Sequence, residues 1–296
     1  MMAPSGDGFS FTLCADDYAL SPAVNRGILE ALAAERLNAT SVMTNMAGWR
    51  LAARDLMPFH PRIEVGLHLN LTLGKPLGPM PGFAPGEEFP PIGRLIRSAY
   101  GKALPEAEIR SEIARQIDAF TEAFGRIPDY VDGHQHVQVL PGIRLWLIQC
   151  LEKKGGEGSA PKGTAPKPWL RNSGDLLPRI FARDGERSKA LMVTAMAQGF
   201  ARLAGRHGFL CNDGFAGFSA FDPEADYAHA FTHFLSAPGK RHLVMCHPGY
   251  CDEELTRLDP VTLTREKELA FLLSEDFAHL LALRKARMTR LAPLVE

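Results

Sequence analysis

A pair of adjacent carboxylates near the start of the chain is the first sign of chemistry. Residues 14 to 18 read Cys-Ala-Asp-Asp-Tyr and follow an apolar run at 9–14. Two neighbouring carboxylates repel each other unless a positive charge lies beside them. A bound divalent cation is the obvious source of that charge, so metal-assisted chemistry is the leading hypothesis.

Histidines elsewhere in the chain could complete a metal site. His68 lies in an alternating apolar run, and the segment 132–136 reads Asp-Gly-His-Gln-His. One aspartate and two histidines supply three protein ligands and leave positions open for water and substrate. We predict Asp17 as the carboxylate ligand and Asp16 as a general base, because adjacent residues on an extended segment point in opposite directions.

The second histidine ligand comes from the segment that contains His134 and His136. On an extended segment, Asp132, His134 and His136 project to the same side. We favour His134 as the ligand together with His68, although His136 fits the spacing nearly as well. Asp132 or His136 then orients the ligand or contacts the substrate.

Two further residues could take part in binding or catalysis. His247 follows a buried-looking strand in Cys-His-Pro-Gly-Tyr, and its imidazole could donate a proton to a leaving group. Arg171 could bind an oxyanion or a sugar hydroxyl, and a surface salt bridge is an equally good interpretation. Arg265 and Glu268 lie on a late helix, where they could pair with site carboxylates or cover the fold.

The elements that must position these residues alternate between strands and helices. Seven strand-like segments are expected at 9–14, 39–44, 63–71, 130–132, 169–171, 208–211 and 242–246. Helices are expected at 22–36, 49–57, 106–124, 141–153, 188–206, 223–236 and 264–273. Strands joined by helical crossovers predict a parallel sheet in an α/β protein.

We predict a distorted or incomplete TIM-like (β/α) barrel, in a single domain over residues 1–296; an open doubly wound sheet is the main alternative. The candidate residues each lie at the C-terminal end of a predicted strand, and active sites of barrels gather at the carboxyl ends of the strands. A Gly/Pro-rich passage at 74–93 is expected to be an ordered loop. A low-complexity segment near 154–167 is expected to be a mobile surface insert.

Composition narrows the possible partners and location. The net charge is −1, from 33 basic and 34 acidic residues, which gives no argument for nucleic acid or an anionic membrane. No segment reads as a secretory signal or a membrane span. The five cysteines are scattered without a CxxC pair, which is typical of reduced thiols in a cytoplasmic protein. A homodimer is the commonest default for oligomeric state.

Taken in order, the short motifs resemble the YdjC/ChbG family of carbohydrate deacetylases, including its hopanoid-associated branch. The matching pieces run from about residue 10 to 275: Ala15-Asp-Asp-Tyr18, Asn25-Arg-Gly-Ile28, Thr40-Ser-Val-Met43, Gly66-Leu-His-Leu69, Asp132-Gly-His-Gln-His-Val137, His247-Pro-Gly-Tyr250, and Arg265 with Glu268. The chain departs from the family at Tyr18-Ala19, where Phe-Gly is common, and in the insert.

The resemblance implies removal of an N-acetyl group from an amino sugar or glycolipid, with release of acetate. It also implies one divalent metal ion, usually magnesium, held by Asp17, His68 and His134. Imidazole ligands by themselves favour zinc or another transition metal. In the mechanism that we expect, Asp16 takes a proton from the attacking water and His247 protonates the departing amine.

Three other functions remain as alternatives. A glycosidase could use two carboxylates without a metal. Another metallohydrolase could be built on the same barrel. A non-catalytic carbohydrate-binding protein could keep the barrel without the reaction, although such a protein has no need of a general base.

Overall fold

The computed structural model describes residues 8–156 and 167–292. Its centre is one eight-stranded sheet in which the strands follow the order β5-β4-β3-β2-β1-β7-β6, with β8 paired to the start of β1. Within the described residues, the paired strands all run parallel to one another. The strands are β1 (Phe9–Tyr18), β2 (Ala39–Val42), β3 (Glu64–Leu69), β4 (Tyr130–Gly133), β5 (Trp169–Leu170), β6 (Gly214–Ala216), β7 (His242–Cys246) and β8 (Ala286–Met288).

The sheet curls until its two end strands nearly meet. Leu170 in β5 forms a parallel bridge with Cys211, and its backbone N–H donates to the carbonyl of Leu210 at 2.8 Å. This single bridge stands where a full strand pairing would close a regular barrel. The prediction of an α/β fold with a distorted, TIM-like barrel is therefore confirmed, and the open doubly wound alternative is wrong.

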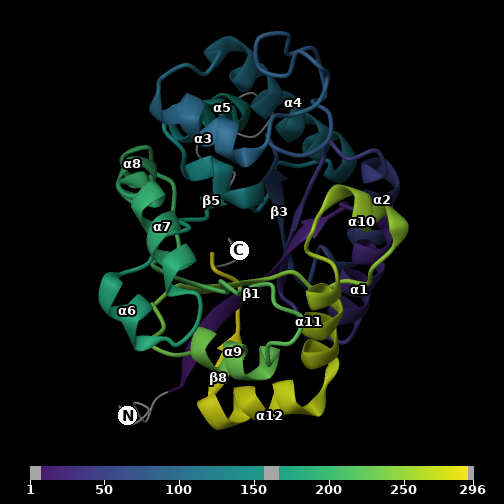
Figure 1. The fold of residues 1–296 in the computed structure, drawn as a ribbon, viewed down its shortest axis with the longest axis vertical. Coiled ribbons are helices and arrows are strands. Elements are labelled where there is room, and N and C mark those ends of the chain that lie inside the picture. Colours follow the sequence, from purple (N-terminus) through teal and green to yellow (C-terminus); the bar gives the residue numbers. More distant parts are fainter. Residues whose placement is uncertain (1–7, 157–166, 293–296) are drawn as a thin grey trace.

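Helices cover the outside of the curled sheet (Figure 1). They are α1 (Pro22–Ala33), α2 (Trp49–Leu56), α3 (Ile92–Tyr100), α4 (Glu106–Phe124), α5 (Ile143–Gly156), α6 (Leu177–Ala182), α7 (Arg187–Ala197), α8 (Phe200–Arg206), α9 (Tyr227–Phe234), α10 (Glu253–Leu258), α11 (Leu263–Leu273) and α12 (Glu275–Arg284). Two short 3₁₀ segments are η1 (Met57–Phe59) and η2 (His134–Val139).

Helix α1 shows how local sequence sets an element in place. The Ser21 hydroxyl accepts from the Val24 backbone N–H at 3.3 Å, and Pro22 occupies the first helical position. Proline suits that position because its missing N–H would have no partner within the helix. Val24, Ile28 and neighbouring apolar residues are buried against the sheet.

Several predicted boundaries differ from the structure. The strand expected at 208–211 is only a bridge at Cys211, and β6 follows three residues later, beginning at Gly214. The helix expected at 188–206 is divided into α7 and α8 by Gly199, whose φ of +81° lies in the left-handed region. Helix α3 was not predicted, because the Gly/Pro-rich sequence before it masks its short amphipathic pattern.

The expected mobile insert falls mainly on residues 157–166, which lie outside the described residues, while 154–156 belong to α5. The single domain over residues 1–296 stays a prediction. Among the helices of the described ranges, none is both long enough and apolar enough to cross a lipid bilayer.

Candidate active site

The carboxyl ends of the strands surround a cavity of about 420 Å³. That volume suits a small organic ligand. Polar residues from the strand ends line one part of it: Asp16, Asp17, His68, His134, His136 and His247. Apolar side chains from the surrounding loops and helices line the rest, among them Leu73, Ile92, Ile96, Met192, Val193, Met196, Phe218, Phe221, Leu258 and Val261.

Asp16 and Asp17 both reach this cavity, which corrects the expectation that they point in opposite directions. Strand β1 continues through both residues, but Asp17 has a φ of +69° and is not extended. The pairing of β1 with β2 shifts register between Ala15 and Tyr18. This irregularity turns the Asp17 side chain toward the cavity. Aspartate tolerates the left-handed region better than most residues do.

Asp17 lies among three basic side chains. Its Oδ1 is 3.2 Å from His68 Nε2 and 3.0 Å from His134 Nδ1, and its Oδ2 accepts from Arg265 Nη2 at 2.7 Å. Burial raises the pKa of Asp17, but Arg265 and the histidines outweigh it and hold that pKa well below its usual range. Asp17 is therefore ionised, as a metal ligand must be.

Asp17, His68 and His134 form a buried group whose potential ligand atoms all lie within 4.8 Å of one another. The structure thus brings together the three residues predicted to bind the metal. Two imidazole nitrogens and one carboxylate oxygen fit a divalent ion, and the donor types favour a transition metal over magnesium.

Asp132 lies behind His68 rather than on the cavity wall. It is fully buried, and its Oδ1 lies 2.7 Å from His68 Nδ1. Burial lowers the pKa of His68, but Asp132 outweighs it and raises that pKa to about 10. Because Asp132 takes the Nδ1 side, Nε2 is the nitrogen that faces Asp17. The position differs from the predicted substrate contact and matches the other prediction, that Asp132 orients a ligand.

Arg171 is also buried behind the cavity, contrary to the expectation that it meets substrate or solvent. Its Nη1 and Nη2 each donate to one oxygen of Asp16 at 2.6 Å, and Nη2 lies 2.5 Å from Asp132 Oδ2. Burial raises the pKa of Asp16, but Arg171 outweighs this effect and holds that pKa well below its usual range. Arg171 therefore fixes an ionised Asp16 in one orientation.

The two histidines after β4 separate in the structure. The strand ends at Gly133, and Gln135 and His136 take positive φ values of +52° and +61°. Positions 132, 134 and 136 therefore do not share one face of an extended strand, as the sequence pattern predicted. His134 reaches Asp17, whereas His136 packs edge-on against Phe215 and Phe218.

His136 lines the cavity without joining the three-residue group. Burial and the nearby Arg171 lower the pKa of His136 to about 3, so its imidazole is neutral at physiological pH. A neutral imidazole in that place can donate or accept one hydrogen bond from a ligand.

His247 also lines the cavity. Its backbone N–H donates to Glu268 Oε2 at 2.6 Å, and its ring meets the edge of Phe221 at 5.4 Å between centroids. Its Nδ1 has no hydrogen-bond partner among the described residues. The ring is therefore placed by its backbone and by packing, and Nδ1 is a buried nitrogen with no protein partner there.

Comparison of this chain with known proteins identifies its family. The family model described as YdjC-like protein matches residues 10–283. The chain belongs to the YdjC family. A carbohydrate deacetylase from Mus musculus is 30% identical over 251 residues, covering 80% of this chain and 76% of the relative. A chitooligosaccharide deacetylase from Enterobacter sp. (strain 638) is 37% identical over 145 residues, covering 48% of this chain and 55% of the relative.

A solved structure supports the fold of this YdjC-family chain. It belongs to an Enterococcus faecalis protein described as a candidate cellobiose-phosphate cleavage protein, with a TM-score of 0.71 and 19% sequence identity. The match covers 96% of this chain and 98% of that protein. The shared architecture therefore extends over nearly the whole YdjC-like chain.

Some residues of the site were missed by sequence reasoning. Ser41 lies 3.0 Å from His68 Nδ1 and donates to Asp16 Oδ1 at 3.3 Å, and its place at the end of β2 was the available signal. Lys189 and Met192 line the cavity from α7. No motif marks those two, because helices with similar apolar and basic residues cover many barrels.

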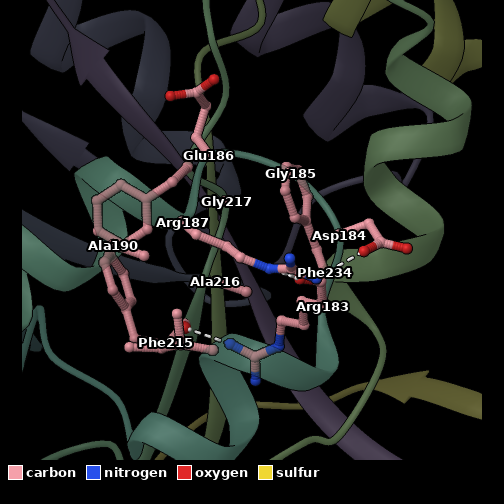
Figure 2. Close-up of a pocket in the computed structure, with 12 residues that line it drawn as sticks. Arg183, Asp184, Gly185, Glu186, Arg187, Ala190, Phe215, Ala216, Gly217 and Phe234 are labelled. Carbon is pink, nitrogen blue, oxygen red and sulfur yellow. Dashed lines mark hydrogen bonds and ion pairs between the residues drawn. The ribbon is translucent and has the colours of Figure 1, made fainter.

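A second, much smaller cavity lies beside the site and has a structural explanation. It holds only about 30 Å³ and is lined by residues of α6, β6 and the following loops. Arg183 Nη1 donates to the carbonyl of Phe215 at 2.8 Å (Figure 2). Its Nε and Nη2 donate to the carbonyls of Ser236 and Ala237, respectively. These contacts hold β6 in the sheet, so the YdjC-family chain uses this region to support the wall that carries Phe215 and Phe218.

Proposed function

We propose that this YdjC-family protein is a metal-dependent hydrolase that removes an N-acetyl group from an amino sugar, an N-acetylated glycan or a glycolipid, and releases acetate. The observation that carries the proposal is the buried group Asp17, His68 and His134, with Asp16 and His247 lining the same cavity. The names of the mouse and bacterial relatives support an amide of an amino sugar as the bond that is cleaved.

Asp17, His68 and His134 would hold one divalent ion. Such an ion polarises a carbonyl oxygen and makes water a better nucleophile. The two imidazoles favour zinc or a similar ion, and magnesium is the other candidate. Asp132 supports the site by holding His68 through Nδ1 at 2.7 Å.

Asp16 is the proton acceptor in the proposal. Arg171 keeps it ionised and fixes both of its oxygens. A carboxylate with so low a pKa is a weak base, so it accepts the proton only as the water oxygen attacks the carbonyl carbon. Arg171 positions Asp16 and does not contact the sugar in this scheme.

His247 donates a proton to the departing sugar amine. Its ring lines the cavity, and its Nδ1 is free of partners among the described residues. His136, which is neutral, binds substrate at the same cavity. The apolar residues around the site would contact the faces of a sugar ring or the attached group of a glycolipid.

The location and assembly are part of the same proposal. All five cysteines are free thiols, which supports a reducing, cytoplasmic compartment. A homodimer is proposed because it is the commonest soluble assembly.

The test is acetate release from N-acetylated chitooligosaccharides, measured before and after removal of metal with a chelator. We expect release to stop after chelation and to return when zinc or magnesium is restored. Full activity after complete removal of metal would reject the metal-dependent mechanism. Cleavage between sugars without acetate release would favour the glycosidase alternative.

A further inference from the structure

Arg265 on α11 occupies an unusual position beside the three-residue group. Its side chain is only 1% exposed, and it lines the cavity. Nη2 donates to Asp17 Oδ2 at 2.7 Å and to Asp259 Oδ2 at 2.9 Å, and Nε donates to the Val261 carbonyl at 2.9 Å. Three contacts on two of its nitrogens therefore fix the guanidinium plane.

The third nitrogen of this guanidinium, Nη1, is buried and has no hydrogen-bond partner among the described residues. Leaving a buried donor of a charged group without an acceptor costs free energy, and such groups in native proteins nearly always have a partner. Arg265 lines the cavity, so a ligand that displaces the groups covering Nη1 can supply the missing acceptor. The unpaired nitrogen therefore points to a bound group rather than to a packing role.

The chemistry of arginine and the place of Arg265 beside Asp17 limit what that acceptor can be. Asp17 Oδ2 holds Arg265, while Asp17 Oδ1 faces His68 and His134. The guanidinium thus lies against the carboxylate that carries the proposed metal site. Arginine only donates hydrogen bonds, so its partner must be an acceptor, and a carbonyl oxygen is the acceptor nearest the bond that the proposed reaction cleaves.

We propose that Arg265 is a substrate-binding residue whose Nη1 donates to the carbonyl oxygen of the N-acetyl group while Nη2 holds Asp17; this rests on the proposed function. The carbonyl oxygen gains negative charge as water attacks, so the contact strengthens in the transition state. One guanidinium then fixes the acyl group and the metal ligand relative to each other.

A purely structural role for Arg265 makes a different prediction. If Arg265 served only to orient Asp17, replacing Arg265 would lower activity only by weakening metal binding. A lysine at position 265 can keep the positive charge beside Asp17 but cannot place a second N–H at the position of Nη1. Arg265→Lys therefore separates the two roles, and Arg265→Met removes both.

The experiment measures metal affinity, kcat and KM for Arg265→Lys and Arg265→Met with di-N-acetylchitobiose. We expect Arg265→Lys to keep its metal and to lose about 10²-fold in kcat, the typical effect of removing one oxyanion donor. Arg265→Met should lose metal affinity as well. Lys267→Met is the matched control, because it removes the same charge from an exposed position on the same helix and should leave both quantities near wild type.

Binding provides a second readout that does not depend on turnover. In an Asp16→Asn background, di-N-acetylchitobiose and fully deacetylated chitobiose are titrated into proteins with Arg or Lys at position 265. We expect the preference for the acetylated sugar to fall roughly 10-fold in the lysine protein. An unchanged preference overturns the Arg265 assignment. Absence of acetate release by the wild type instead overturns the proposed function, and the titration still decides the role of Arg265.

Discussion

Carboxylates are buried at both ends of the sheet, but their hydrogen-bond partners are charged at one end and neutral at the other. At the carboxyl end, Asp16 and Asp17 are each 2% exposed and are held ionised by Arg171 and Arg265. At the amino end, Glu64 is 1% exposed and accepts from the Trp169 indole N–H at 2.9 Å and from the Leu291 backbone N–H at 2.8 Å. These two donors are neutral.

The different partners distinguish carboxylates of the candidate active site from a carboxylate with a structural role. Burial raises the pKa of Glu64, whereas the pKa values of Asp16 and Asp17 are lowered. Glu64 ties β3 to β5 and to the segment after β8, and it does not line the large cavity. Charge held in place beside a cavity indicates chemistry, whereas Glu64 lies away from the cavity and its neutral donors connect parts of the fold.

The largest effect is expected from Asp17→Asn. The amide is a poor metal ligand, so the variant loses one of three donors and one of the carboxylates that pair with Arg265. We expect loss of bound metal and a decrease in kcat of at least about 10³-fold, since metal polarisation contributes several kcal/mol. Elemental analysis and acetate release measure the two effects. His136→Ala should keep its metal, and loss of metal there would reopen the choice between His134 and His136.

Asp16→Asn is expected to be nearly as damaging to turnover while sparing the metal. General acid–base catalysis contributes about 10²- to 10⁴-fold, so kcat should fall by that amount. Metal content should remain near wild type, because Asp16 lies outside the three-residue group. Retained activity would remove Asp16 from its role as base.

Asp132→Asn tests the buried residues behind the site. The variant weakens the contact with His68 Nδ1 and the ion pair with Arg171. We expect metal affinity to fall about 10- to 100-fold, as for other residues that orient a histidine ligand. Isothermal titration with zinc measures this, and Ser41→Ala, which removes the longer contact to the same nitrogen, should have a smaller effect. Equal affinities in Asp132→Asn and wild type would count against the orienting role.

Glu64→Gln is the matched change at the other end of the sheet and should have the smallest effect on activity. We expect kcat within two-fold of wild type and a thermal midpoint that depends less on pH. The folded pKa of Glu64 is raised, so its contribution to stability is fully present below the unfolded value of about 4.5 and is lost as pH rises through the folded value. Thermal unfolding between pH 4 and pH 7 checks this, and an identical pH dependence in both proteins would contradict it.

Much of the fold could be predicted from local patterns. Helix α4 was predicted with its observed bounds at 106–124, because its apolar residues follow a clear helical period. Strand β6 was misplaced, because three residues carry too little pattern to fix a boundary. Gly199 divides a predicted helix because its backbone is left-handed. Glycine adopts left- and right-handed conformations about equally readily, so the sequence alone could not predict this break.

The sequence by itself determined which residue types the site contains and that they lie at the ends of parallel strands, so Asp17, His68 and His134 could be named together. Tertiary structure decided their geometry. It turned Asp17 into the cavity through a positive φ, buried Arg171 and Asp132, and placed Arg265 against Asp17 across 248 positions of the chain. The reason is physical: strand periodicity is a local property, whereas the partner of a buried charge is set by which distant segments the folded chain brings beside it.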